Sequence, residues 1–516
     1  MNKTRASGIL LHPTSLPGKH GIGSMGKSAF KFVDWLEESN QTLWQILPLG
    51  PTGYGDSPYA SFSTFAGNPL LIDLDILVDD GVLIAKDCIT PDYITTQGSI
   101  DFGAVTFWKT PLLYKAATNF LSQKKSKKFQ DFCSEHQWWL EDYATFMSIK
   151  VEYDIKAREE NVDGKFWNNY WPKDLAARNK KALKKWKETH SQNILLEKII
   201  QFFFFSQWMK LKSYANAKGI KIIGDIPIFV ALDSADVWSN QKFFQLKADG
   251  TPKFVAGVPP DYFSKTGQLW GNPLYDWKVL RKSKYNWWKK RISATLSMVD
   301  IVRIDHFRGF ESYWAVPAGD KTAEKGSWIP GPGHHFFTAL GKSLGEIPLL
   351  AEDLGVITPE VGKLRDDFNY PGMKVLQFAF GDNTPETEPL TNAFLPHLYT
   401  NRCIVYTGTH DNTTLRDWLN ELAPHELSLV HEYLGGNCPD ELLVNELIRL
   451  AYMSVADYAV FPLQDIFSIG SEGRMNTPST LGGNWAWRMS EEHLCSKKAE
   501  WLKKLSRLYA RNYSDK

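Results

Sequence analysis

Short apolar runs, rich in β-branched residues, recur along the chain and mostly end in Gly, Pro or Asp. Such runs are typical of buried β-strands. Eight of them predict strands: GILLHP (8–13), TLWQILPLG (42–50), IKIIGDIPIFV (220–230), MVDIVRIDHF (298–307), IPLLAEDLG (347–355), KVLQFAF (374–380), CIVYTGTHD (403–411) and YAVFPLQDIF (458–467). Segments with helical character lie between most of these runs, including 27–39, 194–219 and 439–457.

This alternation of strands and helices predicts an α/β protein with a parallel sheet, since near-continuous apolar strands are buried on both faces. Eight such units favour a closed (β/α)8 TIM barrel. An open doubly wound sheet is the alternative, but no G-x-G-x-x-G follows any predicted strand, so a dinucleotide-binding fold has little support. We expect residues 1–516 to form a single barrel domain with large, mainly helical insertions between its strands.

The predicted strands are unevenly spaced. Residues 51–219 separate the second strand from the third, far more than an ordinary loop, so this segment must contain packed structure of its own. Its interior reads as helical, and we expect a helical insertion subdomain over 51–195. A second insertion, 231–297, is rich in Gly, Pro and aromatic residues, which is typical of functional loops at the mouth of a barrel.

Charge and cysteine content narrow the function classes. The 59 Lys+Arg and 58 Asp+Glu nearly balance, so no overall field attracts nucleic acid or anionic lipid, and we expect neither as a partner. No segment has the apolar length of a membrane span, and the first residues lack the apolar run of a signal peptide. The five cysteines are widely spaced without a C-x-x-C pair, which argues against disulfides and zinc clusters and predicts a cytoplasmic location.

Aromatic residues are prominent, with 20 Trp, 20 Tyr and 30 Phe making up 14% of the chain. Core packing explains clusters such as FFFF at 202–205. Other Trp and Tyr residues stand in Gly- and Pro-rich segments such as YGDSPYASF and TGQLWGNPLYDW. Flat rings beside Asn, Asp and Gln suit sugars, because the C–H faces of a sugar stack on the ring while its hydroxyls form hydrogen bonds.

Charged side chains stand at the ends of four predicted strands, where barrel enzymes carry their catalytic groups. In chain order these residues are Asp225, Arg303, Asp305, Glu352, His410 and Asp411. A helix N-cap is the alternative interpretation of any single acid. Carboxylates converging on one rim nevertheless favour a functional site, because like charges are destabilising without a partner. Arg303, two residues before Asp305 on a strand, would face the same side and hold that carboxylate ionised.

Two carboxylates with different roles are what retaining glycoside chemistry requires. One attacks the anomeric carbon, and the other protonates the leaving oxygen and then deprotonates the incoming hydroxyl. A third can stabilise the cationic sugar ring. Metal binding is the rival explanation, but His-rich ligand spacing is missing, and the HH pair at 334–335 is weak evidence. The chain also lacks a P-loop, so phosphate chemistry is unsupported, and it lacks the G-x-S-x-G elbow of a nucleophilic serine. We expect neither a metal nor another cofactor.

Several long motifs resemble one enzyme family over about residues 7–488. They are GILLHPTSLPG, PTGYGDSPYASFSTFAGNPLLIDL, GDIPIFVALDSADVW, GVPPDYFSKTGQLWGNPLYDW, VRIDHFRGF, AEDLG, GTHDN and RMNTPS. On these motifs the chain resembles the amylomaltases, the 4-α-glucanotransferases or disproportionating enzymes of glycoside hydrolase family 77, which are relatives of the α-amylases. The motifs follow the order that they have in the family.

The resemblance implies a role for individual residues. Asp305 matches the family nucleophile, Glu352 the general acid/base and Asp411 the transition-state stabiliser. Substrate-binding or lid positions match Tyr59, Asp225, Asp261, Gln268, Trp270, Arg303, His410 and Asn476, and His306 belongs to the same site. Packing would be the alternative role for Tyr59 and Trp270, and a turn for Asp261. One departure is visible, because the family usually has Gly after N-x-P whereas this chain has Ser479.

The resemblance further implies transfer of an α-1,4-glucan segment to the 4-hydroxyl of another glucan or of glucose, by a monomer or homodimer without a cofactor. It implies that loops near 54–67, 254–270 and 473–480 cover the reaction intermediate. Hydrolysis of α-1,4-glucans is the alternative within the same superfamily. A non-catalytic glucan-binding protein on an inherited barrel is a third possibility, and the presence of all three carboxylates argues against it.

Overall fold

The computed structural model describes residues 5–123, 126–260, 264–380, 391–436, 438–480 and 482–512. At its centre lies a parallel sheet of β1 (Ala6–Leu10), β2 (Leu43–Gln45), β3 (Lys221–Pro227), β6 (Ile301–Asp305), β9 (Leu349–Ala351), β10 (Gly372–Val375), β11 (Cys403–Tyr406) and β12 (Tyr458–Pro462). The strand order is β10-β11-β12-β1-β2-β3-β6-β9. Each of the eight predicted runs overlaps one of these strands, although the sixth soon turns into a 3-10 helix, Leu376–Ala379.

The sheet is nearly closed into a barrel. The backbone N–H of Ala351, in β9, donates to Pro371 O, just before β10, at 2.9 Å. All eight strands also contribute to one buried apolar cluster, through Leu10, Leu43, Ile223, Ile301, Leu350, Met373, Ile404 and Val460. A cluster shared by every strand is the packed interior of a barrel. The predicted (β/α)8 architecture is therefore confirmed.

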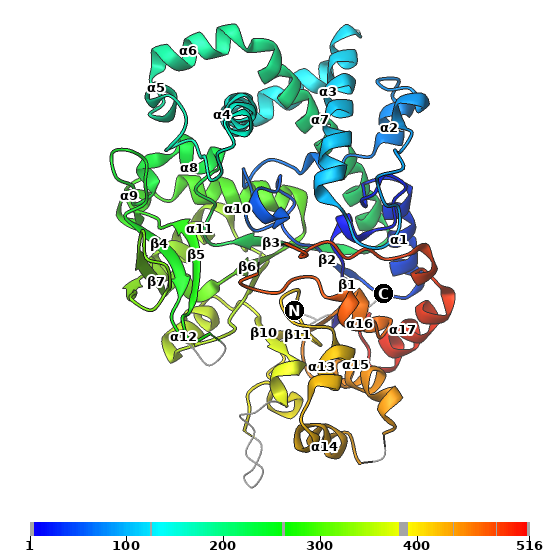
Figure 1. Ribbon diagram of the computed structural model, residues 1–516. Helices are drawn as coiled ribbons and strands as arrows, with labels where there is room; N and C mark the ends of the chain where they lie inside the picture. The colour runs from blue at the N-terminus through cyan, green and yellow to red at the C-terminus, as the bar shows by residue number, and fades with distance from the viewer. Residues whose placement is uncertain are drawn as a thin grey trace.

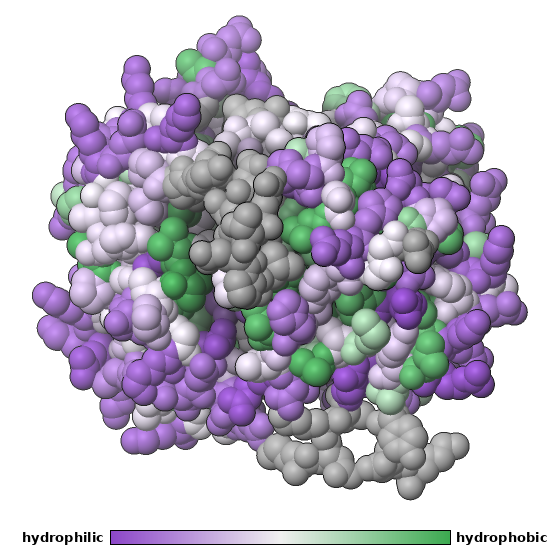
Figure 2. Space-filling view, turned by 90° about the horizontal axis from the view of Figure 1, so that it is seen from below, coloured by the Kyte–Doolittle hydropathy of each residue, from purple (hydrophilic) through white to green (hydrophobic). Residues whose placement is uncertain are grey.

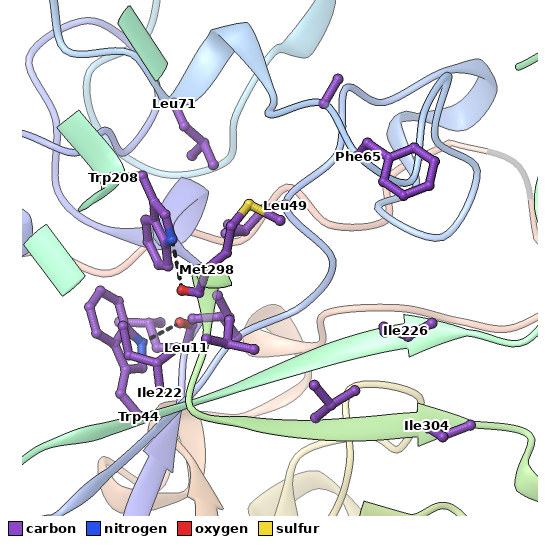
Figure 3. Packing of buried hydrophobic residues seen from close by; sticks show 14 of the residues in the cluster. Leu11, Trp44, Leu49, Phe65, Leu71, Trp208, Ile222, Ile226, Met298 and Ile304 are labelled. Atoms are coloured by element: carbon purple, nitrogen blue, oxygen red, sulfur yellow. Dashed lines mark hydrogen bonds between the residues drawn. The ribbon is translucent and has the colours of Figure 1, made fainter. Parts of the chain in front are cut away.

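Helices lie between successive strands and around the barrel (Figure 1). They are α1 (Lys27–Glu38), α7 (Ser191–Ala217), α10 (Asn286–Met298), α11 (Gly333–Leu344), α12 (Pro359–Asp367), α13 (Leu415–Glu421), α14 (Pro424–Tyr433), α15 (Leu443–Met453) and α17 (Ser496–Leu508). Figure 3 shows how α7 packs on the barrel through Trp208, whose Nε1 donates to Met298 O at 3.0 Å. Beside it, the fully buried Trp44 of β2 donates to Leu11 O at 2.8 Å.

The segment between β2 and β3 is helical. It contains α2 (Leu74–Asp79), α3 (Phe102–Ser122), α4 (Lys127–Glu159), α5 (Lys173–Ala176) and α6 (Lys180–Thr189), followed by α7. In Figure 1, α3, α4 and α6 lie above the barrel strands. The FFFF segment belongs to this packing, since Phe203, Phe204 and Phe205 are all buried. Phe202 and Phe205 contact Phe132 of α4.

The segment between β3 and β6 holds two strands that the hydrophobic pattern did not predict, β4 (Phe254–Val258) and β5 (Gln268–Pro273), together with α8 (Ala235–Ser239) and α9 (Trp277–Lys282). These strands join β7 (Ser312–Pro317) and β8 (Ser327–Pro330) in an antiparallel sheet of order β5-β4-β7-β8. Figure 1 shows β4, β5 and β7 together on one flank of the barrel. The small sheet thus adds a wall beside the β3 and β6 strands.

On the face that Figure 2 shows, hydrophilic residues dominate and hydrophobic ones are scattered among them. Within the described part of the chain, no helix combines the length and apolar character needed to cross a membrane. The five cysteines are all free.

Candidate active site

The centre of the site is an ion-pair triad on adjacent strands. The β3–β6 register pairs Asp225 with Arg303, so their side chains share one side of the sheet. Arg303 Nη1 lies 2.6 Å from Asp225 Oδ2 and 3.0 Å from Asp305 Oδ1. Burial acts to lower the pKa of Arg303, but the two carboxylates hold it well above its usual value. Arg303 therefore stays charged and fixes one oxygen of each carboxylate.

Glu352 follows β9 directly and faces the same strand end. Its Oε2 accepts from the backbone N–H of His306 at 2.7 Å, and its Oε1 from that of Leu354 at 2.8 Å. His306 has a left-handed backbone with φ 53°, an uncommon conformation for a residue with a side chain. Burial raises the pKa of Glu352 to about 8, with Arg303 opposing this rise and Asp305 adding to it. At neutral pH the group is thus mainly protonated.

Asp411 stands in the loop after β11, with its side chain about half exposed at 49%. The side-chain amide of Asn476 donates to Asp411 Oδ1 at 2.6 Å, and His410 Nε2 lies 3.4 Å from Asp411 Oδ2. Arg474 also donates to the backbone oxygen of Asp411 at 3.4 Å. Contacts from two loops thus set the position of this carboxylate.

Tyr59 joins the triad to the Asp411 loop. Its hydroxyl donates to Asp225 Oδ2 at 2.8 Å and lies 3.5 Å from His410 Nδ1. The Tyr59 and His410 rings stack, with centroids 5.0 Å apart. Burial raises the pKa of Tyr59 well above its usual value, so the hydroxyl keeps its proton and remains a donor. Tyr59 therefore bridges groups from β3 and from the loop after β11.

The hairpin of β4 and β5 reaches the residue that follows Asp305. The Trp270 ring meets His306 edge-on, with centroids 4.8 Å apart, and Trp270 Nε1 donates to Gln268 Oε1 at 3.2 Å. Burial lowers the pKa of His306 to about 4, so its ring is neutral. Trp270 is 38% exposed, which leaves ring surface free for a ligand.

Of the eleven site residues named from the sequence besides His306, the structure connects ten, in two groups. One contains Tyr59, Asp225, Arg303, Asp305, Glu352, His410, Asp411 and Asn476, and the other contains Gln268 and Trp270, which meet the first group through His306. The eleventh, Asp261, lies outside the described residues. Ser479 has φ 64°, so it adopts at this position the left-handed backbone that favours glycine.

Sequence reasoning missed Trp485. Its ring lies 5.8 Å from Tyr59 and 5.8 Å from His410, centroid to centroid. The GGNWAW segment at 482–487 has the same pattern of aromatic residues among Gly and Asn as the loops that were singled out, so composition offered a signal. In the described ranges, no group of three or more His, Cys, Asp or Glu side chains is arranged to hold a metal ion.

Comparisons with known proteins agree with this geometry. The model of the 4-alpha-glucanotransferase family matches residues 11–494. A 4-alpha-glucanotransferase of Synechocystis is 48% identical over 98% of both chains, and one of Thermus thermophilus is 47% identical over 95% of both. The solved amylomaltase from Streptococcus agalactiae in complex with acarbose superposes with a TM-score of 0.93 at 39% identity, covering 99% of this chain and 100% of that one. The chain therefore belongs to the 4-alpha-glucanotransferase family, glycoside hydrolase family 77.

Proposed function

We propose that the chain transfers a segment of an α-1,4-glucan to the 4-hydroxyl of another glucan or of glucose, by a retaining double displacement. The observation that carries the proposal is the contrast between two carboxyl groups at one strand end. Asp305 is ion-paired with Arg303, whereas burial raises the pKa of Glu352 to about 8. An ionised nucleophile beside a protonated acid is the combination that the first step of this chemistry needs.

In the first half-reaction, Asp305 attacks the anomeric carbon while Glu352 protonates the glycosidic oxygen. The bond to the leaving sugar breaks, the reducing-end fragment departs, and a glycosyl ester forms on Asp305. Because Arg303 holds Oδ1 of Asp305, we assign the attack to Oδ2. Asp411, held by Asn476, supplies negative charge beside the developing sugar cation.

In the second half-reaction, Glu352 is a carboxylate and removes the proton from the 4-hydroxyl of the acceptor. The acceptor oxygen attacks the anomeric carbon, Asp305 leaves, and an α-1,4 bond forms again. Two inversions give net retention. Transfer exceeds hydrolysis when the loops carrying Tyr59, Trp270 and Asn476 keep water from the ester until a sugar arrives.

Incubation of the purified protein with maltotriose alone tests the reaction. A ladder of longer maltodextrins together with glucose, at a nearly constant number of reducing ends, is the expected result. Shorter products only, with reducing ends rising in step, would mean that water is the acceptor and that the protein is an α-1,4-glucan hydrolase.

Asp305→Asn tests the nucleophile. We expect kcat on maltotriose to fall by about three orders of magnitude or more, because the amide cannot form the glycosyl ester. Acarbose binding, measured by calorimetry, should persist, which shows that the site is still folded. The matched control is Asp79→Asn, an exposed residue of α2, which should leave kcat unchanged. A fully active Asp305→Asn variant would reject this mechanism.

Location and assembly are part of the same proposal. The free cysteines support a reducing compartment, and we propose the cytoplasm, which cell fractionation tests. We propose a monomer or homodimer that acts on maltooligosaccharides and on glycogen- or starch-type chains. Light scattering on the purified protein measures the oligomeric state. Product analysis with each type of glucan shows which donors the protein uses.

A further inference from the structure

Two adjacent residues after β12 contact both loops that position Asp411. Gln464 and Asp465 lie in the short helix α16 (Leu463–Ile466), and each is only 1% exposed. The reaction steps described above use neither of them. Burying an amide and a carboxyl group side by side costs free energy unless their hydrogen bonds are made. Both oxygens of Asp465 and Nε2 of Gln464 have partners, while Oε1 of Gln464 has none in the described part of the chain, so the bonds that are made indicate what the two residues do.

Asp465 spans the base of the Asp411 loop. The hydroxyl of Thr407 donates to Asp465 Oδ2 at 2.5 Å, and the backbone N–H of Leu415 donates to Oδ1 at 2.7 Å. Thr407 directly follows β11, and Leu415 begins α13. His410 and Asp411 stand between these two points. One buried carboxylate therefore ties together the start and the end of the loop.

Gln464 contacts the loop that carries the partner of Asp411. Its Nε2 donates to Gly473 O at 3.0 Å, and a Cβ on Gly473 would lie only 3.1 Å from Gln464 Cγ. Gly473 is followed three residues later by Asn476, which donates to Asp411 Oδ1. The adjacent side chains of α16 thus bond to the two loops that carry Asp411 and Asn476, whose side chains contact each other.

We propose that Asp465 is a positioning residue that, together with Gln464, sets the place of Asp411 in the site, an inference that rests on the proposed function. Asp411 is half exposed, so packing around its own side chain does not fix it. A displacement of about 1 Å in a catalytic group lowers the rate by about 100-fold. The hydrogen bonds of Asp465 to Thr407 and Leu415, at the two ends of the loop, prevent such a displacement.

Asp465→Ala is the first test. We expect kcat for maltotriose disproportionation to fall by about 10- to 100-fold while KM changes less than about threefold, because the loop shifts the stabilising charge more than the bound sugars. Asp465→Asn should restore most of kcat. Its amide oxygen can accept from Leu415 N–H, and its NH2 can donate to the Thr407 hydroxyl.

Asp73→Ala is the matched control, because Asp73 is also a buried carboxylate that accepts from a hydroxyl and from the first N–H groups of a short helix. It caps α2 instead of the Asp411 loop, so its loss should lower Tm but leave kcat unchanged. If Asp465→Ala lowers kcat no more than Asp73→Ala does, the proposal is wrong. Should Asp465→Ala fail to fold, Asp465→Asn and Gln464→Ala replace it in the test. We expect kcat of Asp465→Asn to be near that of the wild type and kcat of Gln464→Ala to be reduced about tenfold.

Combining Asp465→Ala with a substitution of Asp411 distinguishes a role in positioning Asp411 from a role in the stability of the whole fold. In a chain that already carries Asp411→Asn, adding Asp465→Ala should slow single turnover of maltotriose by less than about twofold, because the group being positioned is gone. The full effect in that background would overturn the inference. An Asp411→Asn variant with full activity would instead reject the role assigned to Asp411 in the proposed function.

Discussion

The proton on Glu352 is held by its surroundings. Burial removes water from the carboxyl group, and Asp305 adds a nearby negative charge, while Arg303 and two backbone N–H groups favour the ionised form. Burial outweighs the attraction of Arg303, and the pKa rises to about 8. Glu352 can therefore donate a proton to the leaving sugar at neutral pH and accept another from the acceptor hydroxyl once the glycosyl ester has formed.

The pH dependence of kcat/KM follows from this pKa. Raising the pH removes the proton that the free enzyme must donate, so kcat/KM for maltotriose should fall about tenfold per pH unit above about pH 8. Glu352→Gln should lose activity on maltotriose but still react with an α-glucosyl fluoride, whose leaving group needs no proton. That residual rate should be flat between about pH 7 and 9. A basic limb centred near pH 5 would contradict the assignment.

Site residues differ in how far the sequence alone predicts them. Asp225, Arg303 and Asp305 follow directly from the strand pattern, because parallel strands of a barrel bring their carboxyl ends together. Tyr59 required family resemblance, since it stands in a loop with no periodicity. Trp485 was missed because its approach to Tyr59 depends on the path of a loop over four hundred residues away in the chain.

At the scale of elements, α7 holds the segment 67–73, which follows the loop of Tyr59. Gln201 accepts from Gly67 N–H at 2.7 Å and donates to Gly67 O at 3.0 Å. Gln207 makes the same pair of bonds with the backbone of Asp73, at 2.7 and 3.1 Å. Two buried amides therefore replace the strand partner that this irregular backbone lacks.

Gln201→Ala should lower the free energy of unfolding by about 2–4 kcal/mol, because it leaves a buried N–H and a buried C=O of Gly67 without partners. Urea unfolding followed by tryptophan fluorescence measures the change. Gln137→Ala, an exposed Gln of α4, should change the stability by less than about 0.5 kcal/mol. Equal effects of the two substitutions would show that the backbone of Gly67 finds other partners.

Element prediction succeeded for the barrel and failed for the small sheet, for a physical reason. Barrel strands are buried on both faces and read as continuous apolar runs. In β8, by contrast, all four residues are exposed, and β5 is largely exposed and contains Gly271. β5 and β8 therefore carry no apolar alternation. β4 is buried at its centre, but the small residues Ala256 and Gly257 stand there instead of a run of large apolar residues, so the pattern over 231–297 indicated loops.

At the scale of the whole molecule, the barrel closes between β9 and β10, the two ends of the strand order. Asp353, next to Glu352, joins these ends. Its Oδ1 accepts from the backbone N–H of Met373 in β10 at 2.7 Å, and its Oδ2 pairs with Arg365 of α12. Met373 in turn accepts from Arg303 Nε through its sulfur at 3.4 Å. The closing seam therefore adjoins the catalytic groups.

Asp353→Ala should open this seam. The substitution removes the acceptor of the buried Met373 N–H and the partner of the partly buried Arg365. We therefore expect the free energy of unfolding to fall by about 2–4 kcal/mol. Asp353→Asn keeps an acceptor for Met373 and should cost about half as much. Urea unfolding gives the energies, and hydrogen exchange of the peptide containing Met373 shows whether the seam opens locally.

Asp367→Ala separates seam opening from the loss of an ion pair. Asp367 also lies on α12, but it pairs with Lys363 and His334 at the surface, where such pairs contribute less than about 1 kcal/mol. It should leave exchange at Met373 unchanged. If Asp353→Ala both speeds hydrogen exchange at Met373 and lowers kcat, then the contacts that close the barrel also hold Glu352 in place. If exchange stays slow while stability falls, Asp353 supports only α12, and the seam is held by the backbone bond between Ala351 and Pro371.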